Sequence, residues 1–241
     1  MTLRFSIAQW AAWAPGLTDA TAWRAWLAAP GALPAEGTPA LAEMPAMMRR
    51  RVDRLGRVAL QAAYWGLGDT RDCPIVFASR YGSIGRSIEL LQQLAAEDAV
   101  SPTGFSMSVH NAIAAQFSIA RQDAGNYTAV AAGDETVEAA FTEALGLLAD
   151  GAASVLVVFY DEPLPEALRG PLGPFDFARA WACRVEPVEQ GGISLASTMA
   201  SGEAPAVDLP VDLAVLRFLL SDEAALHHVA GPRAWQWCRH A

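Results

Sequence analysis

The sequence predicts an α/β layered fold in which short strands alternate with helices. Two observations support this. Runs of apolar and β-branched residues at 74–79 and 154–159 have the length and composition of buried strands. The segments between them repeat apolar residues at three- and four-residue steps, which is typical of helices packed on one face. With 241 residues, 53% of them hydrophobic, the chain can bury a substantial core.

The first 65 residues contain a strand, a loose segment and a long helix. Residues 3–10 alternate apolar and polar side chains, which predicts a strand. Proline and glycine punctuate residues 14–40, where one short helix is expected at 19–28. Residues 45–65 show a helical pattern with one apolar face. Three arginines, Arg50, Arg54 and Arg57, lie together on another face of this helix.

The remaining elements continue the alternation. Helices are expected at 87–97, 109–119 and 136–149, with strands at 127–131 and 154–159 and a loop that Ser101-Pro102 opens. After Pro163 the composition changes to Pro/Gly-rich turns. They separate strands at 178–187 and 192–197, a helix at 211–220 and a final strand at 233–239. The chain therefore divides into residues 1–162 and a shorter α+β extension, residues 163–241, which we expect to pack on the same domain.

Charge and cysteine content restrict the function. A formal net charge of −9 disfavours nucleic acid and anionic membrane surfaces as partners. All 17 basic residues are arginine, so no mechanism that uses a lysine is available. Three widely spaced cysteines predict neither disulfides nor a metal site and suit a reducing cytoplasm. The apolar start is interrupted by Gln9 and by Pro15-Gly16, which argues against a secretion signal, and the longest apolar run, 155–160, is too short to span a bilayer.

Common catalytic and cofactor motifs do not match. Gly82-Ser83-Ile84-Gly85 has the wrong spacing for a nucleophile elbow, and no phosphate-binding glycine motif is present. The four histidines lack metal-ligand spacing, and the His227-His228 pair is expected at a helix end in contact with solvent. Asp134-Glu135 and Asp161-Glu162 lie at turns without an indicated acid/base geometry. These residues alone indicate an α/β domain without cofactor, metal or assigned activity.

Three segments resemble one family. Residues 101–121, SPTGFSMSVHNAIAAQFSIAR, resemble the loop and asparagine-bearing helix of β-ketoacyl synthases. Residues 78–83, ASRYGS, resemble the strand-to-loop turn before a helix in these enzymes. Residues 125–163 resemble their central unit, in which a strand is followed by a nucleophile at a helix N-terminus, the helix itself and a buried strand. The resemblance covers residues 3–162, with a weaker similarity at 178–186, and implies the N-terminal half of the thiolase-like layered fold.

The resemblance also implies that the chain is not catalytic. Asp134 falls at the position of the family's nucleophilic cysteine. A carboxylate cannot hold an acyl group as a thioester, and the family's catalytic histidines and lysine belong to a C-terminal half that is missing from the resemblance. Chain-length factors typically carry glutamine at this position, so Asp134 departs from them as well. Its simplest expected role is the N-cap of helix 136–149; the alternative is that it blocks an inactive site.

Ketosynthases resemble one another in pairing through an edge strand, which implies a partner interface here at Tyr127, Thr128, Ala129, Val130 and Ala131. The same resemblance implies an acyl-tunnel wall made by Phe105, Val109, Ile113 and Phe117. The expected partner is a full-length catalytic ketosynthase, with an acyl carrier protein visiting transiently and docking at Arg50, Arg54 and Arg57. The best-fitting relatives are the short chain-length-factor-like ketosynthases of fatty-acid-like and aryl-polyene pathways.

Two other functions stay open from the sequence. The first is an enzyme whose active site is completed at a subunit interface, with Cys73, His110 or Asp134 contributing. The second is a stand-alone acyl-binding protein that uses the pocket of the thiolase-like fold. Each of Phe105, Val109, Ile113 and Phe117 is also compatible with an ordinary place in the core.

Overall fold

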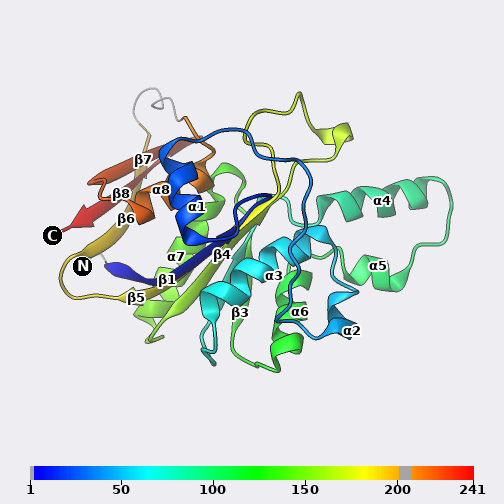
Figure 1. Ribbon diagram of the computed structural model, residues 1–241, viewed down its shortest axis with the longest axis horizontal. Helices are drawn as coiled ribbons and strands as arrows, with labels where there is room; N and C mark the ends of the chain where they lie inside the picture. Colours follow the sequence, from blue (N-terminus) through cyan, green and yellow to red (C-terminus); the bar gives the residue numbers. More distant parts are fainter. Residues whose placement is uncertain (1–2, 201–207) are drawn as a thin grey trace.

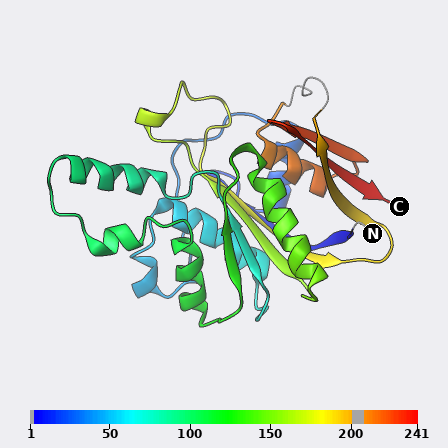
Figure 2. The same cartoon turned by 180° about the vertical axis from the view of Figure 1, so that it is seen from behind.

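A single mixed sheet forms the centre of the molecule, with helices on both of its faces (Figures 1 and 2). The computed structural model describes residues 3–200 and 208–241; residues 1–2 and 201–207 lie outside the described residues. The sheet has eight strands in the order β3-β2-β4-β5-β1-β6-β8-β7. The strands are β1 Phe5–Trp13, β2 Ile75–Ala78, β3 Tyr127–Val130, β4 Val155–Asp161, β5 Arg179–Pro187, β6 Gly192–Met199, β7 Ala225–Ala230 and β8 Arg233–His240.

The helices alternate with the strands in the first part of the chain, so the predicted α/β layered fold is confirmed. They are α1 Ala20–Ala28, α2 Ala46–Arg49, α3 Arg54–Leu67, α4 Ile84–Ala95, α5 Pro102–Ser106, α6 Ala112–Arg121, α7 Thr136–Ala149 and α8 Val211–Leu220. Two 3₁₀ turns are η1 Gly133–Glu135 and η2 Glu166–Leu168. Strands β3, β2 and β4 are parallel, whereas β5, β1, β6, β8 and β7 join by antiparallel pairing.

Strand β4 shows how the two faces are divided, because all seven of its residues are buried and the six before Asp161 alternate between two cores. Val155, Val157 and Phe159 face the core beneath α1, α7 and α8. The residues between them face the core beneath α3 and α6. A strand that buries both faces loses the apolar/polar alternation, which is why its sequence is a continuous apolar run.

The region after Pro163 belongs to the same sheet instead of forming a separate layer. β5 lies between β4 and β1, and β6, β8 and β7 extend the sheet beyond β1. This extension also covers α7. The Trp237 ring packs edge-on against Phe141 with 4.8 Å between centroids, and His228 Nδ1 lies 2.8 Å from the buried Glu138 carboxylate. The boundary at residue 162 therefore marks a change of composition and topology, while the core continues across it.

Three local predictions are wrong. The helix expected at 45–65 is two helices, because Asp53 caps α3 by accepting a hydrogen bond from Gly56 N (2.8 Å). The loop after Ser101 contains the short helix α5, which the Ser101 hydroxyl caps. His227 and His228 lie in strand β7 and not at a helix end, and His228 is buried. In the last case a turn at Gly231 makes a hairpin from residues that show little alternation.

Helices α4 and α5 differ from the others because neither has a buried residue. They form an arm that projects from the body beside α2 (Figure 1). Large apolar side chains on the arm are exposed: Leu91 at 64%, Leu94 at 64% and Phe105 at 63%. The arm therefore buries little apolar surface within this chain.

Candidate functional site

The carboxyl ends of the parallel strands β2, β3 and β4 meet at one edge of the sheet, which is the usual place for a site in an α/β fold. Ser79 and Arg80 follow β2, Asp161 ends β4, and Asp134 lies in the turn between β3 and α7. His110, from the segment before α6, approaches the same edge. The registers of the three strands place these residues together although they are up to 82 positions apart in sequence.

A buried network closes part of this edge. The Ser79 hydroxyl and the Arg80 Nε donate to the Asp161 carboxylate at 2.8 and 2.6 Å. The Ser79 oxygen also accepts from Gly82 N at 2.8 Å. Burial raises the pKa of Asp161, and the Arg80 guanidinium opposes that shift. Because both carboxylate oxygens are occupied, this acid fixes the loop after β2 and has no free oxygen aimed at a substrate.

His110 is held against the same loop. A ring nitrogen of His110 lies 3.1 Å from the Val130 carbonyl oxygen. Gly82 has a positive φ of +54°, and a Cβ added there would lie 2.6 Å from His110 Nδ1. Glycine is therefore required for two reasons, the backbone conformation and the close approach of the imidazole.

Asp134 does not cap α7, so the predicted N-cap role is wrong. The residue at the N-cap is Glu135, which makes no side-chain capping bond. The Thr136 hydroxyl instead organises this turn by donating to Gly133 O (2.7 Å) and accepting from Ala132 N (3.0 Å). Asp134 is exposed at the start of the helix. A carboxylate at this end of a helix is favoured by the helix dipole, but it offers no thiol for acyl transfer.

The cysteines lie away from this turn. Cys73 precedes β2 and is therefore at the opposite end of the parallel strands from Asp134. Cys183 is buried on β5, and Cys238 lies on β8. Burial raises the pKa of both Cys73 and Cys183, which disfavours the reactive thiolate. Of the three residues that an interface-completed enzyme was expected to use, the structure brings only His110 and Asp134 to the same edge.

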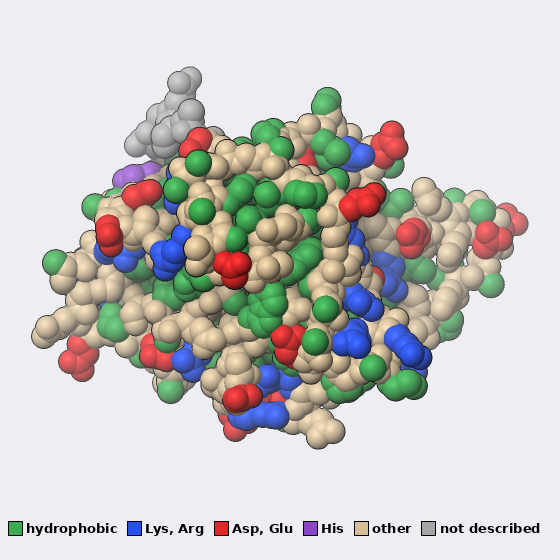
Figure 3. Space-filling model, viewed as in Figure 1, with side chains coloured by type: hydrophobic (Ala, Val, Ile, Leu, Met, Phe, Trp, Pro, Cys, Tyr) green, Lys and Arg blue, Asp and Glu red, His purple; other side chains and the backbone are tan. Residues whose placement is uncertain are grey.

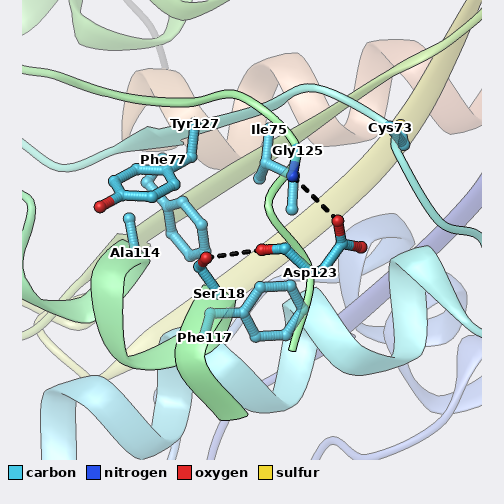
Figure 4. A pocket seen from close by; sticks show the side chains of 9 residues that line it. All are labelled: Cys73, Ile75, Phe77, Ala114, Phe117, Ser118, Asp123, Gly125 and Tyr127. Carbon is cyan, nitrogen blue, oxygen red and sulfur yellow. Dashed lines mark hydrogen bonds between the residues drawn. The ribbon is translucent and has the colours of Figure 1, made fainter. Parts of the chain in front are cut away.

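The four predicted tunnel residues separate into two pairs. Ile113 and Phe117 are buried at 4% and 2% exposure in the core beneath α3, while Phe105 and Val109 are exposed at 63% and 45%. Figure 4 shows Phe117, from α6, below the rings of Phe77 and Tyr127 in a small pocket between α6 and the strands, with Cys73 at the upper right, away from these rings. Within this chain only Phe105 and Val109 are available to a neighbouring subunit.

Strand β3 is an open edge of the sheet, because it pairs only with β2. Asn126 and Val130 accept hydrogen bonds from the β2 segment at 2.9 and 3.2 Å. Backbone groups alternate in direction along a parallel ladder, so the N–H groups of Tyr127 and Ala129 point away from the sheet. Ala131, directly after the strand, is exposed. The predicted interface residues are thus one row with unpaired backbone groups, which a second strand can satisfy.

The predicted docking arginines are partly engaged within the chain. Arg54 donates to the carbonyls of Ala35 (2.7 Å) and Gly37 (3.0 Å), and Arg57 donates to those of Arg49 and Val52. Arg50 is exposed. Figure 3 shows basic side chains gathered on the side of the molecule that carries α2 and α4. This side of the molecule is therefore basic, and Arg54 and Arg57 also hold the neighbouring loop segments through hydrogen bonds to backbone carbonyls.

Other site classes find no support in the residues that the structure describes. Within 3–200 and 208–241, no group of three or more histidine, cysteine or acidic side chains is placed to hold a metal ion. In the same ranges, no helix combines the length and apolar character that crossing a bilayer needs.

Comparison with known families identifies the chain. The model of the β-ketoacyl synthase N-terminal domain matches residues 23–238. The chain therefore belongs to the β-ketoacyl synthase N-terminal domain family. The match continues well beyond residue 162, so the sequence resemblance placed the end of the shared region too early. No curated protein gives a significant match.

Solved structures are similar over most of the chain. One is a chain from the complex of the ketosynthase ApeO with its chain length factor ApeC from Xenorhabdus doucetiae, at 29% identity and a TM-score of 0.83; the match covers 99% of this chain and 100% of that one. The ishigamide ketosynthase/chain length factor is 17% identical with a TM-score of 0.64, over 81% of this chain and 67% of that one. A β-ketoacyl synthase from Burkholderia phymatum is 15% identical with a TM-score of 0.64, over 85% and 66%. The last two show the shared thiolase-like fold.

Proposed function

We propose that this chain is a non-catalytic, chain-length-factor-like subunit that pairs with a full-length ketosynthase in polyketide biosynthesis. The observation that carries the proposal is a match that covers both chains almost completely, 99% of this one and 100% of the one from the ApeO–ApeC complex. Against the ishigamide and Burkholderia structures the same chain covers only 67% and 66% of the matched chain. A short chain of this shape thus occurs in a complex that joins a ketosynthase to a chain length factor.

The residues at the edge of the parallel strands support a non-catalytic role. Asp134 occupies the turn before α7 where the family's nucleophile lies, and Thr136 makes the hydrogen bonds that start the helix. Both carboxylate oxygens of Asp161, a buried acid at the same edge of the sheet, are hydrogen-bonded by Ser79 and Arg80. Acyl transfer by this family needs a thiolate, and the cysteines of this chain are remote from that turn or buried. Catalysis would then belong to the partner.

The open edge at β3 and the exposed arm supply the surface for pairing. A partner strand beside β3 would satisfy the outward N–H groups of Tyr127 and Ala129 and extend the sheet across the interface. Phe105 and Val109 lie on the same part of the chain and would face the partner's growing acyl chain. We further propose that the complex is cytoplasmic, that its product is of the aryl-polyene kind, and that an acyl carrier protein docks near Arg50.

Co-expression with a full-length ketosynthase from the same gene neighbourhood tests the proposal. We expect a one-to-one complex in light scattering on a sizing column. Ala129→Pro removes an N–H that points away from β2, so it should abolish the complex while leaving the chain's own ladder paired. Ala129→Ser keeps the N–H and serves as the matched control. A chain that stays alone beside the ketosynthase, or a complex that Ala129→Pro leaves intact, contradicts pairing through β3.

Catalysis is tested separately. The purified chain should not decarboxylate malonyl thioesters, and Asp134→Ala should leave ketosynthase activity of the complex within about twofold of the parent, because a carboxylate at this position has no covalent role. Decarboxylation by the chain alone that disappears in Asp134→Ala would establish an enzyme and overturn the non-catalytic assignment.

A further inference from the structure

A cavity lies between the turn after β2 and the loop that joins β4 to β5. This loop, residues 162–178, stands above the sheet as the yellow-green segment in Figure 1. The volume of the cavity is about 240 Å³. Sites for drug-sized ligands usually have about 300–1,000 Å³. The cavity is therefore of a size for a small molecule.

Part of the lining is apolar and open to solvent. Leu168 and Leu172 line the cavity and are 53% and 51% exposed, and Tyr81 on the other side of the loop is 46% exposed. Exposed apolar groups around a cavity are stabilised when a ligand removes them from water. This rim therefore favours a ligand with an apolar part.

Two arginines present N–H groups to the same cavity. Arg80 Nε donates to Asp161 at 2.6 Å, and the Arg80 guanidinium lies 5.5 Å from the centre of the Tyr81 ring. Within the residues that the structure describes, the two terminal nitrogens of Arg80 make no hydrogen bond, and neither does the side chain of the half-buried Arg169. Guanidinium groups with free N–H are well suited to bind a carboxylate.

Two carboxylates also line the cavity. One Asp176 oxygen accepts a hydrogen bond from Gly173 N at 2.6 Å, which leaves the other oxygen open. Glu162 is half-buried, and its side chain has no hydrogen bond or ion pair in the described part of the chain. Burial raises the pKa of Glu162, the Arg54 guanidinium opposes this shift, and the Asp53 carboxylate adds to it. A cation beside Glu162 would stabilise its ionised form.

The opposite charges of this cavity do not pair with one another. Across residues 3–200 and 208–241, no ion pair joins the arginines of the lining to Glu162 or Asp176. The hollow beside α8 differs, because Arg217 there donates to Asp208 through two nitrogens at 2.9 and 3.0 Å. Charges of both signs that share a cavity without pairing are each available to a ligand that carries both charges.

We propose that this cavity binds a zwitterionic apolar α-amino acid. Arg80 and Arg169 contact its α-carboxylate, Glu162 and Asp176 contact its α-ammonium group, and the leucine rim covers its side chain. A simple anion or a simple cation would leave the groups of the other sign without a partner. The site needs no second subunit, so the inference is independent of the proposed pairing with a ketosynthase.

Isothermal titration calorimetry on the full chain tests the site with L-leucine and three comparators. Leucinamide lacks the carboxylate, N-acetylleucine lacks the ammonium group, and glycine lacks the apolar side chain. We expect saturable binding of leucine and at least about tenfold weaker binding of each comparator, because each comparator loses one kind of contact.

Two variants assign the charges. Arg169→Gln should weaken the binding of leucine about three- to tenfold and leave the binding of leucinamide unchanged, because leucinamide has no carboxylate to lose contact with. Glu162→Gln should weaken the binding of leucine by a similar factor and leave that of N-acetylleucine unchanged. Glu166→Gln, exposed in the same loop, and Arg50→Gln, exposed on the far side of α2, are the matched controls and should bind leucine like the parent.

Absence of saturable leucine binding overturns the inference. Equal binding of leucine, leucinamide and N-acetylleucine also overturns it, because the charged groups of the cavity would then have no part in recognition. The comparators are measured on the parent chain, so the proposal stays falsifiable even where a variant does not fold. Circular dichroism of each variant reports its folding separately.

Discussion

Helices α4 and α7 begin at the same edge of the sheet, each after a parallel strand, yet they end in different environments. α7 turns back over the sheet and buries seven residues, including Phe141 and Leu148. α4 projects away from the body and buries none. Both helices carry an apolar face, so the amino-acid pattern alone does not explain the difference. The face of α7 is covered by strands and by α8, whereas the face of α4 has no cover within the described residues.

This contrast separates a helix whose apolar face is buried within the chain from a helix whose apolar face is exposed. The apolar face of α7 is part of the core, and its contacts lie within this chain. Leu91 and Leu94 on α4 are each 64% exposed, which gains almost nothing from the hydrophobic effect in the isolated chain. A contiguous exposed apolar surface on a folded chain is typical of an interaction site. The comparison therefore supports the arm as a surface that pairing covers.

The largest effect is expected from truncating a buried side chain of α7. Phe141 is fully buried and contacts the rings of Phe5, Trp181 and Trp237. Phe141→Ala should reduce the free energy of unfolding by about 4 kcal/mol, measured by urea denaturation. Leu91→Ala, on α4, should change it by less than about 0.5 kcal/mol. A large loss for Leu91→Ala in the isolated chain would show that the arm is packed after all.

The cover over α7 is tied to the sheet by a buried ion pair. Arg179 makes two hydrogen bonds to the Asp212 carboxylate, at 2.6 and 2.7 Å, with both side chains nearly inaccessible. Asp212→Ala leaves the arginine buried and unpaired and should cost about 3 kcal/mol or more in urea denaturation. Loss of less than about 1 kcal/mol would mean that water reaches Arg179 in the folded chain.

The pair Arg217–Asp208 is its exposed control. Its hydrogen bond from Arg217 lowers the pKa of Asp208. A lowered folded-state pKa gives stability above the ordinary carboxyl pKa that is lost as pH falls through the lowered value. Because the Asp208 side chain is 66% exposed, Asp208→Ala should reduce the free energy of unfolding by less than about 1 kcal/mol at neutral pH. The difference should vanish at a pH where Asp208 is protonated in both the folded and the unfolded state.

Two glycine-to-alanine substitutions, one in the loop that leads to α4 and one inside α7, should change the stability in opposite directions. Gly82→Ala should destabilise the chain by about 1–3 kcal/mol, because alanine is strained at its positive φ and would press on His110. Gly146→Ala, on α7, meets no atom within 4 Å of the added Cβ. It should stabilise the chain by about 0.5–1 kcal/mol. Thermal unfolding followed by circular dichroism distinguishes the two signs.

The smallest effect concerns thiol reactivity. Burial raises the pKa of Cys73 and Cys183, and both lie in the body. We expect a thiol reagent at pH 8 to titrate only Cys238 in the folded chain and all three thiols in denaturant. Rapid reaction of Cys73 in the folded chain would show that the cavity beside α6 opens, and would revive its candidacy as a reactive residue.

Much of the fold was predictable from the sequence because periodicity reports burial directly. The continuous apolar run at 154–159 predicted β4, and the three- and four-residue spacing of 136–149 predicted α7. What failed were positions where a single polar contact decides. The Asp53 side chain starts α3 as a separate helix, and β7 is held by pairing to β8 and by the contact of His228 with Glu138. Neither contact has a periodic signal.

The candidate site was predictable in position but not in chemistry. The order of strand, turn and helix placed Asp134 at the end of the parallel strands, and the structure agrees. Asp161 was noticed only as an acid at a turn, because its partners Ser79 and Arg80 lie more than 80 residues earlier in the chain. The sequence also did not indicate which of the predicted tunnel residues are exposed: Ile113 and Phe117 are buried, while Phe105 precedes α6 and is exposed.

The position of β1 sets the order in which the sheet can be completed. This first strand pairs with β5 and β6, both near the other end of the chain. At a synthesis rate of about 5–20 residues per second, roughly 10–30 s separate the appearance of β1 from that of β5. During that interval β1 has no native neighbour in the sheet, and its backbone groups remain available to other strands. Folding of this chain thus depends on a late, long-range closure, a topology associated with slow folding and with a risk of aggregation during synthesis.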